Sequence, residues 1–327
     1  MNVLAAILAA AVPAAFYGLL IWWLDRYEKE PLWLIILAFV WGSLPAIGLS
    51  LLFEVVLRVP IAETTIGPNL GSWGLAALVE EPIKALALIG LFLFMRREFD
   101  GTLDGIVYGS LVGFGFSMTE NLLYFLHYGA NLEALFWLRS VFFGLNHAFF
   151  TSLIGLALGV VRYRRAPALR LAALGGGLTL AILFHALHNY AVRFRLPGLL
   201  LSWLLQSGGV LVILAIVMLS WRKERQWIEH ELREEVRGGV LAPSDYLEIS
   251  SPARRLRRQL RALFGGGWAS FARVRRLHHL ATKLAFCKTQ LGLDDRHYTS
   301  DDRDRLRGQI TELRATLERD EQAWAHP

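Results

Sequence analysis

Long apolar runs dominate the first two thirds of the chain. Seven of them are near or above the roughly 18–20 residues that an α-helix needs to cross a bilayer. The predicted spans are residues 3–24, 32–57, 73–95, 104–127, 137–161, 171–191 and 198–221. No basic segment precedes the first run and Trp22 and Trp23 end it as interface anchors, so we interpret it as a retained span rather than a signal peptide. The pattern predicts an all-α fold, a polytopic transmembrane helical bundle.

Two heptad seams follow in the last third of the chain. Their apolar residues, three or four positions apart, are Leu277, Leu280, Leu284, Cys287 and Leu291, then Leu306, Ile310, Leu313 and Leu317. This spacing predicts two helices that pack along one face of each. We therefore expect a membrane domain over residues 1–221 and a charged helical tail over residues 222–327 that forms a C-terminal cytoplasmic hairpin.

Composition agrees with a membrane protein. Hydrophobic residues make up 54% of the 327-residue chain and charged residues 19%, against about 25% charged residues in soluble domains. A soluble enzyme and a disordered protein are excluded. The single cysteine, Cys287, excludes an internal disulfide and a cysteine-rich metal site. The net charge of +6 is most simply explained by basic residues beside spans, which contact the lipid bilayer, so no nucleic-acid partner is expected.

The lysine and arginine residues of the short connections predict the orientation. Those after the first, third and fifth spans are Arg26, Lys29, Arg96, Arg97, Arg162, Arg164, Arg165 and Arg170. The opposite side has only Arg58, Arg139, Arg193 and Arg195. Because basic connections stay in the cytoplasm, we expect an extracytoplasmic N-terminus and a cytoplasmic C-terminus.

Glycine recurs at short intervals in the fourth predicted span, at Gly105, Gly109, Gly113 and Gly115. The first three are four residues apart, so they share one helix face. Small residues at this spacing let two helices approach closely. We predict that the fourth span packs tightly against a neighbouring helix.

Polar and ionisable side chains inside the spans form the candidate site. They are Glu80, Glu81 and Lys84 in the third span, Glu120 and Asn121 in the fourth, His147 in the fifth, and His185 and Asn189 in the sixth. An isolated Asp, Lys or Arg costs about 2.5–3.5 kcal/mol at the bilayer centre, so such residues are usually functional. At 1.5 Å per residue, Glu80, Glu120, His147 and His185 all lie roughly 10–13 Å below the outer surface. The shared depth predicts a single site.

Several chemistries fit such a group. Carboxylates with imidazoles can activate water directly, or they can hold a divalent metal ion that does so. The chain has no H-E-x-x-H sequence, which excludes a zincin helix. Buried Glu, Lys and His also form proton relays, so a proton- or ion-coupled transporter remains an alternative, as does a non-catalytic binder of membrane proteins.

The ordered motifs resemble those of the PrsW-type intramembrane proteases, which are related to the CAAX prenyl endopeptidases and the CPBP proteins. The motifs are Glu80-Glu81-x-x-Lys84, Phe116-x-x-x-Glu120-Asn121, His147 and His185-x-x-x-Asn189. The resemblance covers roughly residues 15–220 and makes residues 1–221 a protease domain. It implies an endopeptidase of a bacterial-type inner membrane. Its substrate would be a membrane-anchored protein such as an anti-sigma factor, cut near the extracytoplasmic half of the membrane.

The resemblance also implies roles for individual residues. The catalytic group would be Glu80, Glu81, Glu120, His147 and His185. Lys84, Asn121 and Asn189 would orient the substrate. Glu120, His147 and His185 could hold one divalent, zinc-like ion, and the motifs leave both a glutamic and a metal-dependent mechanism open. The tail lies outside the resemblance, and it could bind a cytoplasmic partner or mediate self-association.

Overall fold

The computed structural model describes residues 2–62, 73–293 and 298–325. Helices account for 88% of the chain, and the described residues contain no strand. The all-α fold predicted from the sequence is therefore confirmed. The chain divides into two compact units. Unit 1 consists of Met1–Asp25 and Glu30–Val217, and unit 2 of Arg26–Lys29 and Met218–Pro327.

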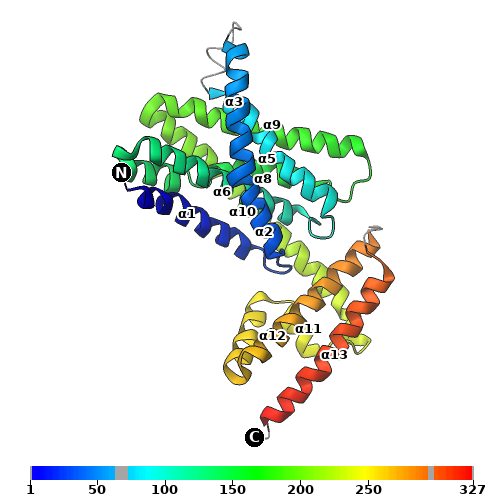
Figure 1. The fold of residues 1–327 in the computed structure, drawn as a ribbon. Coiled ribbons are helices and arrows are strands. Elements are labelled where there is room, and N and C mark those ends of the chain that lie inside the picture. The colour runs from blue at the N-terminus through cyan, green and yellow to red at the C-terminus, as the bar shows by residue number, and fades with distance from the viewer. Residues whose placement is uncertain (1, 63–72, 294–297, 326–327) are drawn as a thin grey trace. The chain divides into compact units, whose positions relative to one another are not determined.

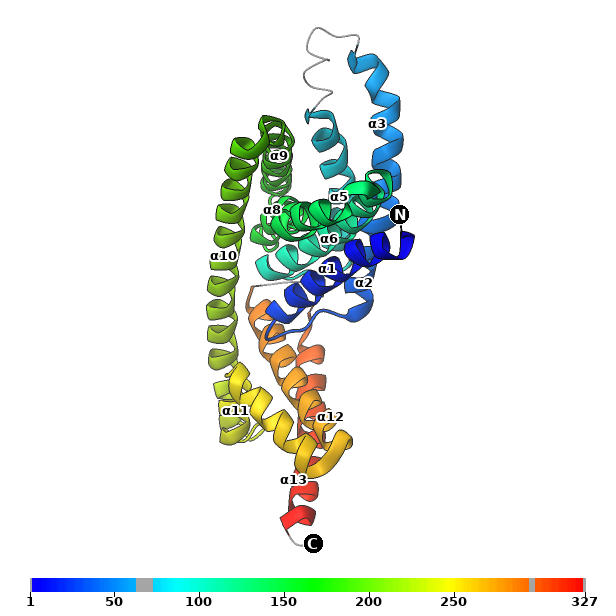
Figure 2. The same cartoon turned by 90° about the vertical axis from the view of Figure 1, so that its left-hand side faces the viewer.

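Unit 1 is built from helices with few polar positions. In chain order these are α1 (Val3–Leu24), α2 (Leu32–Trp41), the π-helical turn η1 (Gly42–Ala46), α3 (Ile47–Ala62), α5 (Leu75–Phe94), α6 (Thr102–His127), η2 (Gly129–Asn131), α7 (Leu132–Leu135), the π-helical turn η3 (Phe136–Phe142), α8 (Asn146–Val160), α9 (Pro167–Ala191), η4 (Val192–Phe194) and the first part of α10 (Arg195–Arg237). Figures 1 and 2 show their arrangement.

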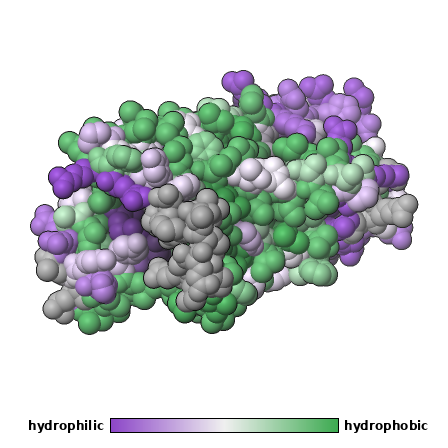
Figure 3. Space-filling view, turned by 90° about the horizontal axis from the view of Figure 1, so that it is seen from above, coloured by the Kyte–Doolittle hydropathy of each residue, from purple (hydrophilic) through white to green (hydrophobic). Residues whose placement is uncertain are grey.

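Among the residues that the structure describes, four helical stretches are long and apolar enough to cross a membrane: Val3–Leu24, Leu32–Leu57, Leu132–Val160 and Pro167–Arg237. Large hydrophobic side chains are exposed on the helices, among them Phe94 and Val55 at 78% and 72%. Hydrophobic residues also cover much of the face seen in Figure 3. These surfaces suit contact with lipid rather than water, which agrees with a membrane protein. The count of seven spans and the orientation of the termini stay predictions.

Helix α6 lies in the middle of unit 1, in contact with α1, α2, α5 and α8 (Figures 1 and 2). Its glycines bring the backbones of α6 and α8 together, as the four-residue spacing predicts. A Cβ atom on Gly105 would overlap the carbonyl oxygen of Gly155, and one on Gly113 would overlap that of His147. The first turn of α8 is thus set directly against α6.

Unit 2 contains the end of α10, α11 (Pro243–Ile249), α12 (Pro252–Gly292) and α13 (Ser300–Ala325). The predicted hairpin is present, because α12 and α13 pack against each other. Their seam residues are in one core: Leu277, Leu280, Leu284, Cys287, Leu306, Ile310 and Leu317 are buried, and Leu291 and Leu313 are partly buried. Arg255 of α12 donates hydrogen bonds to the carbonyl oxygens of Tyr27 and His278, both at 3.2 Å.

Replacing Gly113 with alanine is expected to destabilise the protein. Alanine is favoured over glycine by about 1 kcal/mol inside a helix. Here the added Cβ overlaps the backbone of α8, and such overpacking costs about 1–3 kcal/mol. We expect Gly113→Ala to lower the thermal unfolding midpoint of the detergent-purified protein. Gly90→Ala in α5 is the matched control, because nothing lies within 4 Å of its Cβ position. Equal midpoints for the two variants would contradict tight packing at Gly113.

Candidate active site

Helix α5 presents two carboxylates and a lysine on one turn. Glu80, Glu81 and Lys84 are all buried, with exposed fractions of 6%, 0% and 0%. The Lys84 Nζ atom donates hydrogen bonds to Glu80 Oε2 and to Glu81 Oε1, each at 2.9 Å. A buried charge without a partner is expensive. The ammonium and the two carboxylates therefore stabilise one another inside unit 1.

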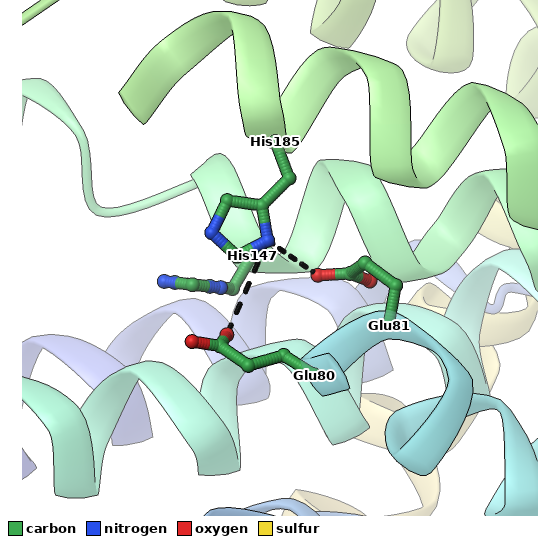
Figure 4. A group of neighbouring side chains, drawn as sticks. All are labelled: Glu80, Glu81, His147 and His185. Atoms are coloured by element: carbon green, nitrogen blue, oxygen red, sulfur yellow. Dashed lines mark hydrogen bonds and ion pairs between the residues drawn. The ribbon is translucent and has the colours of Figure 1, made fainter. Parts of the chain in front are cut away.

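Two imidazoles from other helices complete this group (Figure 4). His185 of α9 has its Nδ1 atom 2.9 Å from Glu81 Oε1 and 4.0 Å from Glu80 Oε2. His147, in the first turn of α8, has its Nδ1 atom 3.0 Å from Lys84 Nζ. The two rings are nearly perpendicular, with centroids 5.1 Å apart. Three separate helices thus bring five ionisable side chains together.

The hydrogen-bond partners assign a proton to each imidazole. Lys84 Nζ is an ammonium and can only donate, so His147 Nδ1 accepts from it and His147 Nε2 carries the proton. That proton is donated to Glu120 Oε2, 2.8 Å away. Glu81, as a carboxylate, only accepts, so His185 Nδ1 carries the proton and leaves its Nε2 lone pair available. Each histidine is thereby oriented by a carboxylate.

The ligand chemistry of this group fits a divalent metal ion. One donor atom from each of Glu80, Glu81, His147 and His185 lies within 4.8 Å of the others. Carboxylate oxygens and imidazole nitrogens are ligands that zinc accepts. Glu120, which the resemblance included as a ligand, is outside this set and contacts His147 instead. Lys84 Nζ hydrogen-bonds with three of the four residues, so a metal ion and this ammonium compete for the same lone pairs.

Arg139 extends the site beyond the residues found from the sequence. Its Nη2 atom is 2.9 Å from Glu120 Oε2, and its Nε donates to Asn121 Oδ1 at 2.9 Å. In the sequence, this arginine counts only toward the predicted orientation of the chain. It belongs to the π-helical turn η3, and such turns are frequent at functional sites because they redirect side chains. Its only sequence signal is its position near the end of a predicted span.

His188 forms a second, partly buried network next to the group. Its Nδ1 atom is 2.8 Å from Ser202 Oγ and 3.0 Å from Gln206 Nε2, both on α10. Its Nε2 atom is 3.4 Å from Asn146 Nδ2. The spacing of His185 and His188 puts both on one face of α9. The structure shows that they have different partners, because His185 contacts Glu81 and His188 contacts Ser202.

The two asparagines predicted to orient a substrate do not contact the Glu–His group directly. Asn121 donates to Ser117 Oγ at 3.4 Å, and Asn189 donates to the carbonyl oxygen of Trp73 at 3.3 Å. Both line a cavity of about 620 Å³ in unit 1. The cavity is also lined by Glu54, Glu80, Glu120, Arg139, His147, His185 and His188. Glu81 and Lys84 are absent from its lining and lie behind it.

Apolar helices around a cavity that carries buried carboxylates and imidazoles define a candidate hydrolase of the membrane interior. Comparison with protein families is consistent with this class. The family model described as PrsW family intramembrane metalloprotease matches residues 30–221. The chain therefore belongs to the PrsW family, and it is a peptidase. The match includes every candidate site residue, and it ends where the predicted tail begins.

Individual relatives of the chain are also named as PrsW proteases. A "Protease PrsW" of Geobacillus kaustophilus is 31% identical over 42% of this chain and 59% of its own length. One of Oceanobacillus iheyensis is 29% identical over 66% of this chain and 91% of its own length. One of Bacillus subtilis is 26% identical over 55% of this chain and 82% of its own length. No solved structure matches the chain.

Removing the lysine of the group is expected to destabilise unit 1. Lys84→Met leaves two buried carboxylates without their cation, and breaking such a pair costs about 3–5 kcal/mol. We expect a clearly lower thermal unfolding midpoint in detergent with a metal chelator present. Arg225→Met is the control, since Arg225 is 58% exposed in its pair with Glu229 and exposed pairs contribute about 0–1 kcal/mol. A Lys84→Met midpoint as high as that of the control would refute this view of Lys84.

Proposed function

We propose that the chain is an endopeptidase that hydrolyses a peptide bond of a membrane-anchored protein within unit 1. Its catalytic group would be Glu80, Glu81, Glu120, His147 and His185. The observation that carries this proposal is that Glu80, Glu120, His147 and His185, which come from four helices, line one cavity. Glu81 lies behind the cavity and hydrogen-bonds with His185. A proton relay needs groups arranged one after another along a path. Groups gathered around one cavity are better suited to chemistry on a bound polypeptide. An anti-sigma factor is the kind of substrate that the family resemblance suggests.

Glu80 and Glu81 take different roles in this proposal. Glu80 lines the cavity, so its carboxylate can reach a water molecule beside a bound peptide and accept a proton from it. Glu81 has no exposed surface and hydrogen-bonds with Lys84, His185 and Thr151. Glu81 therefore positions the Lys84 ammonium and the His185 imidazole. Glu80 is the proposed general base.

Glu80, Glu81, His147 and His185 are the proposed ligands of one divalent ion. A bound ion would supply Lewis-acid polarisation of the scissile carbonyl and of the attacking water. His147 would ligate through Nδ1, because its Nε2–H group is held by Glu120. His185 would ligate through Nε2, because Glu81 holds its Nδ1–H group. Carboxylate contacts of this kind fix the orientation of ligand histidines in metal sites.

Three further polar groups of the cavity would orient the peptide. Asn121 and Asn189 carry amide N–H groups, and Arg139 carries a guanidinium. Such donors can hydrogen-bond to peptide carbonyl groups and to the oxyanion that forms during attack. The depth predicted from the sequence supports cleavage in the extracytoplasmic half of the membrane.

Loss of the general base is expected to abolish cleavage. General acid–base catalysis contributes about 10²–10⁴-fold, so Glu80→Gln should reduce cleavage by about 100-fold or more, and His147→Ala similarly. New N-termini among membrane proteins can be compared by mass spectrometry between cells that make the wild type and each variant. Glu133→Gln is the control, because this glutamate is exposed on α7. An unchanged set of N-termini in Glu80→Gln, at equal protein level, would overturn the assignment of this residue.

Metal content tests the ligand set separately. We expect about one divalent ion per detergent-purified chain, and none in His147→Ala/His185→Ala. Elemental mass spectrometry gives the stoichiometry, and thermal unfolding of the same samples controls for folding. An active wild-type preparation without a bound ion would refute the metal site and leave the carboxylates as the water-activating groups.

A further inference from the structure

The first part of α12 carries an apolar stripe that the rest of unit 2 leaves exposed. Leu256, Leu260, Phe264 and Trp268 follow one another at intervals of four residues, and their exposed fractions are 57%, 41%, 84% and 72%. The opposite face is occupied, because Ala262 belongs to the core of unit 2 and Arg255 is buried. Exposed aromatic residues gathered in this way mark an interaction surface. We call these four residues the α12 stripe.

Along the sequence, the charged residues around the α12 stripe are all basic. Residues 252–276 contain eight arginines and no aspartate or glutamate. Five of these arginines are exposed: Arg254, Arg257, Arg261, Arg275 and Arg276. Their charge is available to an external partner, which must be anionic over a broad area. Apolar side chains with flanking arginines on one helix are typical of helices that lie in the membrane interface.

Glycine separates this segment from the part of α12 that forms the hairpin. Gly267 has φ 72° and ψ −169°, a conformation that favours glycine, and α12 bends there (Figures 1 and 2). Beyond the bend, Val274, Leu277 and Leu280 belong to the core of unit 2. The segment before the bend is therefore a distinct arm that presents Leu256, Leu260 and Phe264, and Trp268 is exposed immediately after the bend.

The chain itself tethers this arm to a segment that is apolar enough to cross a membrane. Unit 2 continues from α10, and the stretch Pro167–Arg237 is apolar enough to cross a membrane. A tethered group meets a nearby surface at a high effective concentration, so even a weak attraction suffices for attachment. In the predicted orientation that surface is the cytoplasmic leaflet, which carries anionic lipid.

We propose that the α12 stripe docks on the anionic phospholipid surface of the membrane as an in-plane anchor. Phe264 and Trp268 insert among the acyl chains, and Arg254, Arg257 and Arg261 contact the lipid phosphates. A bilayer fits better than a protein partner, because the surface combines apolar side chains with charge of a single sign. The proposal does not depend on the peptidase activity of unit 1.

The test uses the full-length chain in nanodiscs of phosphatidylcholine alone or with phosphatidylglycerol. The native Cys287 is fully buried, so a cysteine placed at the exposed Ala253, beside the stripe, can be labelled selectively with a polarity-sensitive fluorophore. We expect a blue-shifted label, protected from a water-soluble quencher, only in discs with phosphatidylglycerol. A label at Ala315, exposed on α13, should be quenched in both lipids.

Two variants separate the apolar and charged contributions. Phe264→Ser/Trp268→Ser should remove the protection. Arg257→Gln/Arg261→Gln should weaken attachment by about fivefold for each arginine. Arg305→Gln/Arg319→Gln, on α13, is the control with the same change of charge and should keep the protection. In each variant, Cys287 should stay unreactive to thiol reagents, which verifies that unit 2 is folded.

Other results would overturn the proposal. Equal protection in phosphatidylcholine alone would exclude recognition of anionic lipid. Protection in detergent that rises with protein concentration would assign the stripe to a contact between two copies of the chain. Protection that survives both stripe variants would show that another segment covers Ala253.

Discussion

The close approach of α6 and α8 is the constraint on which the candidate site depends. Gly105, Gly109 and Gly113 place no side chain between the two backbones, and Gly113 lies directly against the backbone of His147. Any larger residue there would displace the first turn of α8 and the imidazole with it. Glu120, on the same helix as Gly113, reaches the Nε2 atom of His147. One helix pair therefore fixes both the position and the orientation of this ring.

Charge balance is the second constraint, because an unpaired charge is expensive in surroundings of low dielectric constant. The group holds three carboxylates, Glu80, Glu81 and Glu120, and two permanent cations, Lys84 and Arg139. With both imidazoles neutral, three negative and two positive charges leave one net negative charge. A site with this balance attracts a further cation. The same balance explains why Lys84 can hold the carboxylates together when no other cation is present.

Much of the fold was readable in the sequence, since helical periodicity and apolar runs depend only on local spacing. Leu277 on α12 and Ile310 on α13 could be placed in one core for that reason. Depth counting likewise selected Glu80 and His147. It could not identify the role of Arg139, because a span end does not reveal a π-helical turn. Nor could it decide whether Glu120 is a ligand, because distances between helices are absent from the sequence.

The two adjacent glutamates show how one helix turn can separate two tasks. Successive residues of an α-helix point about 100° apart, so neighbours in sequence face different surroundings. Glu80 faces the cavity, while Glu81 is fully buried against Lys84 and His185. A group that exchanges protons with water must reach the cavity, whereas a group that holds its neighbours in place works best without competing water. The proposed division between a base and a positioning carboxylate follows from this difference in exposure.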